Sequence, residues 1–303
     1  MKIPFIKYTK VWVALTILVV LLSGAALFKW GLKLGIDFTG GSLLELAFNQ
    51  NRPETENFKQ TLTGIGLKDP VVQKSGEAKF IVRTNFLSEE EHQLVLKQVR
   101  EKYQINSTTV REERFETIGS AISSQLRQRA IWAIILVNLG IIAYVAYAFR
   151  NVSRPVVSWK YGALAIVAQL HDIMLVLGVF ALLGHYYGVE VGLDFVVALL
   201  TVIGFSVTDT IVVYDRIREN LLHRRNADFG ETVNEGLNQT LMRSINTTMT
   251  VLLPLFALYF LGGSTIHSFA LALLVGMASG AYSSIFIASP LLVVVEKWQH
   301  KTS

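Results

Sequence analysis

An aspartate, Asp209, lies in the middle of an apolar stretch that is long enough to cross a membrane. Thr208 and Thr210 flank it and Ser206 precedes it by about one helical turn, so its face of the predicted helix is polar. An ionisable side chain in hydrocarbon costs about 2.5 to 3.5 kcal/mol, and such residues commonly mark ion or proton pathways. The carboxyl group could therefore change protonation during a transport cycle. The alternative is a neutral or paired aspartate that only fixes helix packing.

A polar stripe follows on the next apolar stretch. Arg243 stands near its start, and Asn246, Thr247 and Thr250 come three, four and seven residues later, which places all four on one helix face. Polar side chains aligned within a membrane need partners inside a bundle. We therefore predict an ion-coupling group that includes Arg243, Asn246 and Thr247, with Arg243 paired to Asp209. The alternative is an arginine at the cytoplasmic end that extends to the lipid headgroups.

His171 and Asp172 interrupt a third apolar stretch, and Gln169 precedes them. Two neighbouring ionisable groups inside a span indicate either a proton relay or a contact that holds two helices together. Because a histidine and an aspartate can also satisfy each other, both interpretations stay open.

The composition argues against several other kinds of site. The chain has no cysteine, so disulfides and thiolate metal sites are impossible. Its six histidines lack the spacing of a metal site, and there is no GxxxxGK[ST] phosphate loop. No constellation of nucleophile, base and metal is readable either. We expect no enzymatic activity, no bound metal and no cofactor.

The chain as a whole is predicted to be a polytopic membrane protein. Hydrophobic residues make up 51% of its 303 residues and charged residues only 17%. About 20 residues cross the hydrocarbon, and six apolar stretches are long enough to do so. They cover roughly residues 11–29, 130–149, 160–183, 193–213, 244–261 and 267–295. The first also resembles a secretory signal, but it exceeds the usual length of about 7 to 15 apolar residues, so we expect a retained helix.

The segment between the first two stretches has the pattern of a small α+β domain. Runs with β-branched residues predict strands, and polar segments with apolar stripes predict helices, the second of which begins with the capping box Ser88-Glu89-Glu90-Glu91. The predicted strands are Ser42–Phe48, Val71–Lys74, Lys79–Asn85 and Ser107–Phe115, and the predicted helices are Pro53–Leu62 and Ser88–Tyr103. This β-α-β-β-α-β order is that of a ferredoxin-like sandwich.

Charge divides the chain in the same way. Residues 31–128 contain 13 basic and 13 acidic residues, so the net charge of +5 comes from the rest of the chain, where most bases lie just outside apolar stretches. This distribution is typical of membrane orientation and argues against nucleic-acid binding. We predict three parts: residues 1–30 with the first membrane helix, residues 31–128 as the external domain, and residues 129–303 with the other five helices.

Basic residues cluster in alternate connections, which the positive-inside rule places in the cytoplasm. They are Lys2, Lys7, Lys10, Arg150, Arg154, Lys160, Arg216, Arg218, Arg224, Arg225, Lys297 and Lys301. Both termini are therefore predicted to be cytoplasmic and the domain at 31–128 extracytoplasmic. Arg127 and Arg129 oppose this orientation but are outnumbered.

Two further segments leave alternatives open. Residues 216–241 are polar and helix-compatible, and Val233, Leu237 and Leu241 would form an apolar face on the membrane or a partner. A solvated connector helix is the alternative. A GxxxG pattern that begins at Gly276 would allow close helix packing, within the bundle or against another subunit.

Several segments together resemble the SecF subunits of the bacterial protein-export machinery. The run Gly35-Ile36-Asp37-Phe38-Thr39-Gly40-Gly41-Ser42, after the first span, resembles a signature shared by SecD and SecF. Residues 165–172, 204–220, 238–250 and 280–290 are similar to SecF blocks in order and position, most specifically the run SVTDTIVVYDRIREN. Thr208 departs from the family pattern, which has asparagine there. The resemblance covers nearly the whole chain.

The resemblance implies a six-helix subunit of the bacterial cytoplasmic (inner) membrane, related to one half of the RND transporters. It implies pairing with SecD into a twelve-helix unit, in which proton flow at the SecD/SecF interface moves the external domains and helps preproteins emerge from SecYEG. Carried over by motif, Asp209 and Arg243 would be the proton-path residues of this subunit. Gly35, Asp37 and the two glycines Gly40 and Gly41 would shape the turn between the first helix and the external domain; substrate contact is the alternative.

Two other functions compete with this one. An RND-like half-transporter could export a small hydrophobic molecule by ion coupling, although a single small external domain offers little room for a substrate pocket. A passive scaffold could use its intramembrane charges only to hold subunits together. Sodium could replace protons, because a cluster of carboxyl and hydroxyl groups suits either ion.

Overall fold

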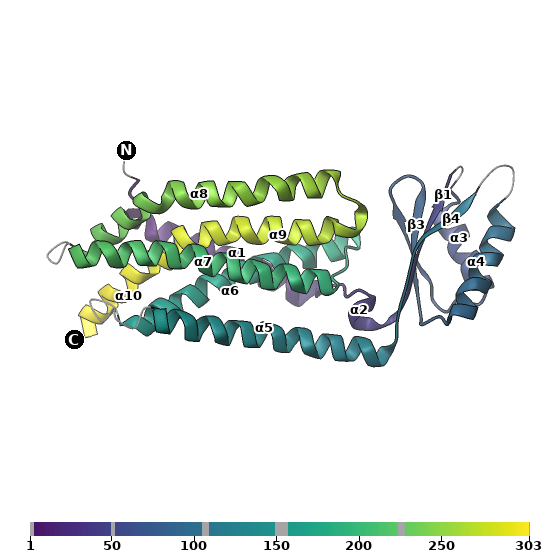
Figure 1. Ribbon diagram of the computed structural model, residues 1–303, viewed down its shortest axis with the longest axis horizontal. Helices are drawn as coiled ribbons and strands as arrows, with labels where there is room; N and C mark the ends of the chain where they lie inside the picture. The colour runs from purple at the N-terminus through teal and green to yellow at the C-terminus, as the bar shows by residue number, and fades with distance from the viewer. Residues whose placement is uncertain (1–2, 50–51, 105–108, 149–156, 224–227, 303) are drawn as a thin grey trace. The chain divides into compact units, whose positions relative to one another are not determined.

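The chain divides into a helical unit and a smaller α+β unit in the computed structural model (Figure 1). The structure describes residues 3–49, 52–104, 109–148, 157–223 and 228–302. The helical unit comprises Met1–Lys33 and Trp132–Ser303, and the α+β unit comprises Leu34–Ile131. Lys2, Arg150, Arg154, Arg224 and Arg225 of the orientation argument, and Ser107 at the start of a predicted strand, lie outside the described residues.

The membrane-spanning helices confirm the predicted fold class. Six helical stretches among the described residues are long and apolar enough to cross a membrane, and the last of them is interrupted by a π-helical turn. The helices are α1 (Thr9–Trp30), α5 (Ser120–Ala148), α6 (Ser158–Tyr187), α7 (Leu193–His223), α8 (Phe229–Leu261), α9 (Ser264–Ser283), the π-turn η2 (Ser284–Ala288) and α10 (Ser289–Thr302). A short 3-10 turn, η1 (Ile6–Tyr8), precedes α1.

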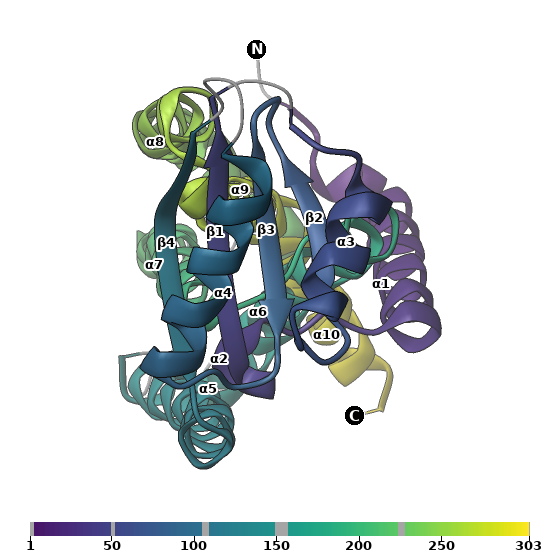
Figure 2. The same ribbon diagram turned by 90° about the vertical axis from the view of Figure 1, so that its right-hand side faces the viewer.

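Helices α6, α7 and α9 form the interior of the helical unit. About half of the most apolar part of α7 is buried and two thirds of that of the last span, against only 6% for α5 and 11% for α1. Figure 2, which views the helices along their length, shows α1, α5 and α8 at the periphery. Side chains that carry chemistry on α6, α7 and α9 are therefore enclosed by this chain itself.

Close packing of α7 against α9 depends on two glycines. A Cβ atom on Gly276 would lie 2.3 Å from a methyl carbon of Val202, and one on Gly280 would lie 3.1 Å from Cβ of Ser206. Both distances are shorter than ordinary carbon contacts. The GxxxG pattern is thus used within the bundle of this chain, which was one of the two predicted alternatives.

Residues 216–241 do not form the separate helix that the sequence predicted. The first part continues α7 and the last part begins α8, with residues 224–227 between them outside the described residues. Val233 and Leu237 are fully buried, and Gly236 packs against Ile217. The apolar face is therefore covered mainly by the chain's own α7. Neither alternative that the sequence left open, a face on the membrane or a partner or a solvated connector, describes it.

The α+β unit has the predicted ferredoxin-like topology. Its strands lie in the order β2-β3-β1-β4 and every neighbouring pair is antiparallel. Helices α3 and α4 cover the same face of the sheet (Figure 2), and their apolar side chains pack with those of the strands in one core. The elements are α2 (Ile36–Thr39), β1 (Gly41–Phe48), α3 (Thr55–Gly64), β2 (Val71–Ser75), β3 (Lys79–Thr84), α4 (Glu89–Tyr103) and β4 (Val110–Ile118).

Two of the four signature residues have a backbone conformation that favours glycine. Gly40 and Gly41, between α2 and β1, have φ angles of 76° and 114°. A Cβ atom on Gly41 would lie 2.5 Å from the carbonyl oxygen of Thr84, so β1 could not approach β3 with a larger residue there. Asp37 lies in α2, and Gly35 before it has φ −76°, which any residue can adopt. The geometry favours a structural role for the glycine pair.

We expect Ser88→Ala to loosen the start of α4. The Ser88 hydroxyl accepts a hydrogen bond from the Glu91 N–H (3.3 Å), and the Glu91 carboxylate accepts one from the Ser88 N–H (2.8 Å). Loss of such a cap typically costs about 1 kcal/mol. Amide hydrogen exchange in the first turn of α4 should therefore become about fivefold faster. Exchange as slow as in the unaltered protein, measured beside an exposed Ser124→Ala control, would show that the capping box contributes nothing.

Candidate functional site

Asp209 lies on the inward face of α7 and joins three elements. Its carboxylate accepts a hydrogen bond from the Ser244 hydroxyl of α8 at 2.7 Å and another from the Ser284 hydroxyl of η2. The residue is 9% exposed, and Thr208 directly before it is exposed. Asp209 therefore lies near the edge of the bundle, bonded to this chain on one side and close to whatever covers α7 and α8.

Asp172 lies deeper, on α6, and is completely buried. Its two carboxylate oxygens accept hydrogen bonds from the hydroxyl groups of Ser206 on α7 (2.6 Å) and of Ser279 and Ser283 on α9 (2.5 and 2.7 Å). The ring nitrogen Nδ1 of His171 lies 3.2 Å from the same carboxylate. The Asp172 carboxylate thus connects α6 to α7 and α9, which is one of the two roles that the sequence left open. The other role, a proton relay, stays a prediction.

Serine hydroxyls suit a carboxyl group that gains and loses a proton. A hydroxyl donates one hydrogen bond and can also accept, so it can turn from donor to an ionised carboxylate into acceptor from a protonated one. In the part of the chain that the structure describes, neither Asp209 nor Asp172 lies within ion-pair distance of a lysine or arginine. Both carboxyls are therefore held by groups that tolerate either charge state.

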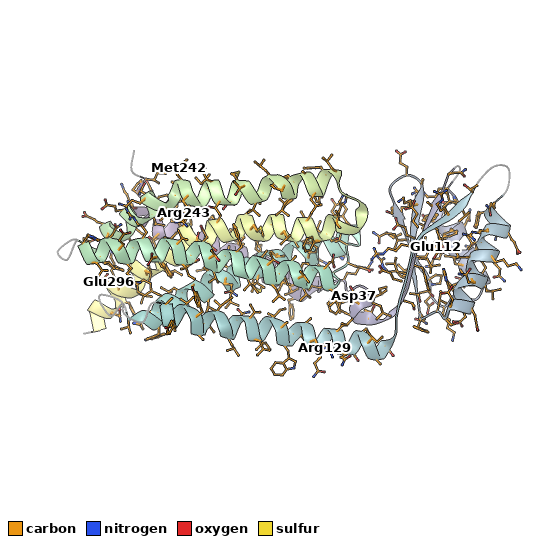
Figure 3. All side chains as sticks on the ribbon, in the orientation of Figure 1. Asp37, Glu112, Arg129, Met242, Arg243 and Glu296 are labelled. Atoms are coloured by element: carbon orange, nitrogen blue, oxygen red, sulfur yellow. The ribbon has the colours of Figure 1, made fainter. Side chains whose placement is uncertain are left out.

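The predicted pair between Arg243 and Asp209 is not formed among the described residues. Arg243, which Figure 3 labels on α8, is exposed, as are Asn246 and Thr247. Ser244 and Thr248 of the same helix are buried. Because successive side chains on a helix point about 100° apart, Ser244 takes the inward position that the pairing required of Arg243. These polar side chains do share one face of α8, but that face points away from the interior of this chain.

Sequence reasoning missed the hydroxyl partners of the two carboxyls. It named Ser206 only for the polar face beside Asp209, whereas the structure bonds Ser206 to Asp172. Ser279 and Ser283 recur at a spacing of four inside the last span, which places them on one helix face. That spacing was a usable signal. Ser244 and Ser284 gave no such signal, because single serines are common in membrane helices and their orientation depends on tertiary packing.

Comparison with known proteins places this site in a family. A family model described as protein export membrane protein SecD/SecF, C-terminal, matches residues 98–298, and a model of the SecD/SecF GG motif matches residues 25–51. The protein translocase subunit SecF of Thermobaculum terrenum is 41% identical over 99% of this chain and 95% of its own. The SecF subunit of a Synechocystis strain is 36% identical over 99% of this chain and 96% of its own.

The chain belongs to the SecF family.

Solved structures agree with this SecF assignment. The crystal structure of SecDF from Thermus thermophilus, described as a translocon-associated membrane protein, aligns with a TM-score of 0.84 and 36% identity over 98% of this chain. The super-membrane-facing form of SecDF aligns over the whole chain with a TM-score of 0.71. This chain spans about 39% of the length of the first SecDF chain.

The matched regions contain the candidate site. The SecD/SecF C-terminal region includes both buried carboxyls, the four elements that surround them and the outward stripe on α8. The GG motif region includes the glycine pair between α2 and β1. In this SecF chain the carboxyl site and the glycine turn therefore belong to different units of the fold.

Proposed function

We propose that this chain acts with SecD as an accessory subunit that uses the proton motive force to promote preprotein translocation through SecYEG. The observation that carries the proposal is Asp209, a carboxyl at the edge of the bundle whose partners among the described residues are the hydroxyl groups of Ser244 and Ser284. The relatives named SecF and SecDF support the role in protein export. The chain is then one half of a twelve-helix, RND-like unit.

The outer side of α8 supports a partner within the membrane. Arg243 and Asn246 are exposed there, although lipid offers no hydrogen bonds to such groups. Thr247 and Thr250 are exposed beside them and donate to carbonyls of their own helix. The neighbouring exposed position on α7 is Thr208, directly before Asp209. A SecD helix that covers this polar strip would enclose Asp209 and satisfy the stripe, and the proton path would run along the contact.

The membrane potential supplies enough energy for such a cycle. Moving one elementary charge across 100 mV is worth about 2.3 kcal/mol. One or two protons could thus shift a conformational equilibrium by several kcal/mol, enough to reverse the populations of two states that differ modestly in free energy. The α+β unit is the part that such a shift would move.

The cytoplasmic location of both termini belongs to the same proposal, in the bacterial inner membrane. The amino-terminal segment is bound to the start of α8, where the side chains of Asn234 and Asn238 hydrogen-bond the backbone groups of Ile3. Lys7 and Lys297 line a cavity of about 430 Å³ at this place, with residues of α8. The positive-inside rule puts this basic end in the cytoplasm and the α+β unit outside.

The small-molecule half-transporter is not favoured, because the relatives that match over nearly the whole chain are named protein translocase subunits. Four open cavities lined by described residues lie beside the start of α8, on α1 or on the α+β unit, and Asp209 and Asp172 line none of these four. A scaffold without ion coupling predicts that replacement of Asp209 leaves stimulated export largely intact.

Export into energised inverted membrane vesicles tests the proposal. Vesicles that lack their own SecF, supplied with this chain and its SecD, should regain the stimulation of preprotein translocation by the proton motive force. A protonophore should remove that stimulation and leave the ATP-driven part. Translocation that is equally fast with and without the chain would reject the export function. Stimulation that survives the protonophore but needs sodium would replace the proton by sodium.

A further inference from the structure

Two buried carboxyls are linked through neighbouring serines at the junction of α9 and η2. Ser283, the last residue of α9, donates its hydroxyl to Asp172, and Ser284, the first residue of η2, donates to Asp209. The same two carboxyls are also linked through α7, because Ser206 binds Asp172 and stands three residues before Asp209. The site at Asp209 and the site at Asp172 thus share two elements.

The junction is a π-helical turn, a conformation that is rare and occurs mostly at functional sites. Pro290, the second residue after the turn, has no N–H to donate to the preceding turn. Two carbonyls of the turn are bonded by side chains: that of Ser284 accepts from the Ser289 hydroxyl (3.0 Å) and that of Ala288 from the Tyr214 hydroxyl (3.2 Å). These two side-chain bonds add to the backbone hydrogen bonds of the π-turn, and regular α-helical winding, as in α9 and α10 on either side, is the alternative conformation of η2.

Asp172 is fixed far more firmly than Asp209. It accepts three serine hydroxyls from α7 and α9 and contacts His171, whereas Asp209 accepts two hydroxyls. Charge-assisted hydrogen bonds are roughly twice as strong as neutral ones. A proton on Asp209 therefore weakens the bond from Ser284, while the bonds that hold Ser279 and Ser283 to Asp172 persist.

The side of η2 opposite to the carboxyls contacts the amino-terminal part of the chain. The ring of Phe286 lies 5.6 Å from that of Phe5 and 4.5 Å from that of Trp12, between ring centroids. Phe5 is itself buried in the core of the helical unit. A change in the winding of η2 would therefore reach both α10 and the cytoplasmic start of α1.

We propose that Asp172 is a positioning residue for Asp209: it fixes Ser283, so that a change of charge at Asp209 moves η2 and α10 rather than the whole of α9. The proposal rests on the proposed function, in which Asp209 changes its charge. It assigns the first step of the ion-coupled movement, before any movement of the α+β unit, to the segment from Ser284 onward. It gives Asp172 a role distinct from proton carriage along the SecD contact.

A double-substitution experiment tests this role. The chain has no cysteine, so Leu222→Cys on α7 and Lys297→Cys on α10, both at exposed positions, can carry spin labels in a complex with a cysteine-free SecD. Asp209→Asn imitates the protonated carboxyl and should shift the label-to-label distance distribution. In a chain that also carries Asp172→Asn, the same substitution should produce no shift, and Asp172→Asn alone should lower stimulated export at least fivefold.

If the Asp172→Asn chain does not fold, a second variant tests the same inference. Ser283→Ala removes one hydroxyl beside Ser284 and should also abolish the shift, whereas Thr240→Ala should keep it, because the Thr240 hydroxyl bonds only its own helix. A shift of equal size with and without the Asp172 or Ser283 change would overturn this inference alone. A distance distribution and an export rate that do not respond to Asp209→Asn in the otherwise unaltered chain would overturn the proposed function as well.

Discussion

Asp209→Asn is expected to abolish the stimulation of export by the proton motive force, a loss of at least tenfold in the stimulated rate, while assembly with SecD is preserved. Asparagine has nearly the same shape, and its oxygen can accept the bond from Ser244 or Ser284 that the carboxylate accepts now. It cannot bind and release a proton. Translocation into energised vesicles measures the rate, and co-purification with SecD measures assembly.

Asp215→Asn is the matched control for this prediction. Asp215 lies on the same helix, but its side chain is 69% exposed and lies 3.6 Å from Arg218, so its removal should leave stimulated export within about twofold of normal. Equal export by the Asp209 and Asp215 variants would mean that Asp209 is structural. That is the outcome a passive scaffold requires.

Gly276→Leu is expected to prevent most of the chain from folding. A Cβ atom at this position already approaches Val202 to 2.3 Å, and leucine adds three more carbon atoms between α7 and α9, the innermost pair of helices. Overpacking of this kind costs about 1 to 3 kcal/mol when side chains can give way and more when two backbones must separate. Val202 has no second rotamer that removes the contact entirely, because it is branched at Cβ.

The yield of monodisperse detergent-solubilised protein measures this effect. We expect it to fall at least fivefold for Gly276→Leu. Gly140→Leu on α5 is the control, since no atom lies within 4 Å of its added Cβ and the yield should be unchanged. A normal yield and melting temperature for Gly276→Leu would show that α7 and α9 do not pack as the structure has them.

The membrane spans and the small sheet could be predicted from the sequence because each rests on a local signal. Apolar length identifies the spans. In the α+β unit, strand alternation and the capping box at Ser88 identified the elements, and their order specified the topology. These features need no knowledge of which helices become neighbours.

Residues 216–241 show where local patterns stop being informative. The spacing of Val233 and Leu237 correctly predicted an apolar face, but not what covers it. The structure shows that α7 extends beyond its apolar part and packs on that face itself. An apolar stripe indicates that a helix face is buried, but tertiary packing determines which surface covers that face.

The candidate site was predictable in its ionisable groups and not in its partners. Asp209 and Asp172 stand out because a charge inside an apolar stretch is rare. The pairing of Asp209 with Arg243 assumed that the arginine faces inward, and a rotation of one residue along α8 gives that position to Ser244. Composition does not show which of these two side chains points inward, because both faces of α8 carry polar residues.

Proton flux through the reconstituted complex tests the central claim most directly. Proteoliposomes should contain this chain with SecD and an internal pH dye, and a membrane potential is imposed on them. Their internal pH should change with the wild-type chain, and it should change equally with the Asp215→Asn control. With Asp209→Asn the flux should fall to that of protein-free liposomes. Equal flux through the wild-type and Asp209→Asn complexes would contradict the account, because the proton path would then not include the carboxyl on which the proposed function depends.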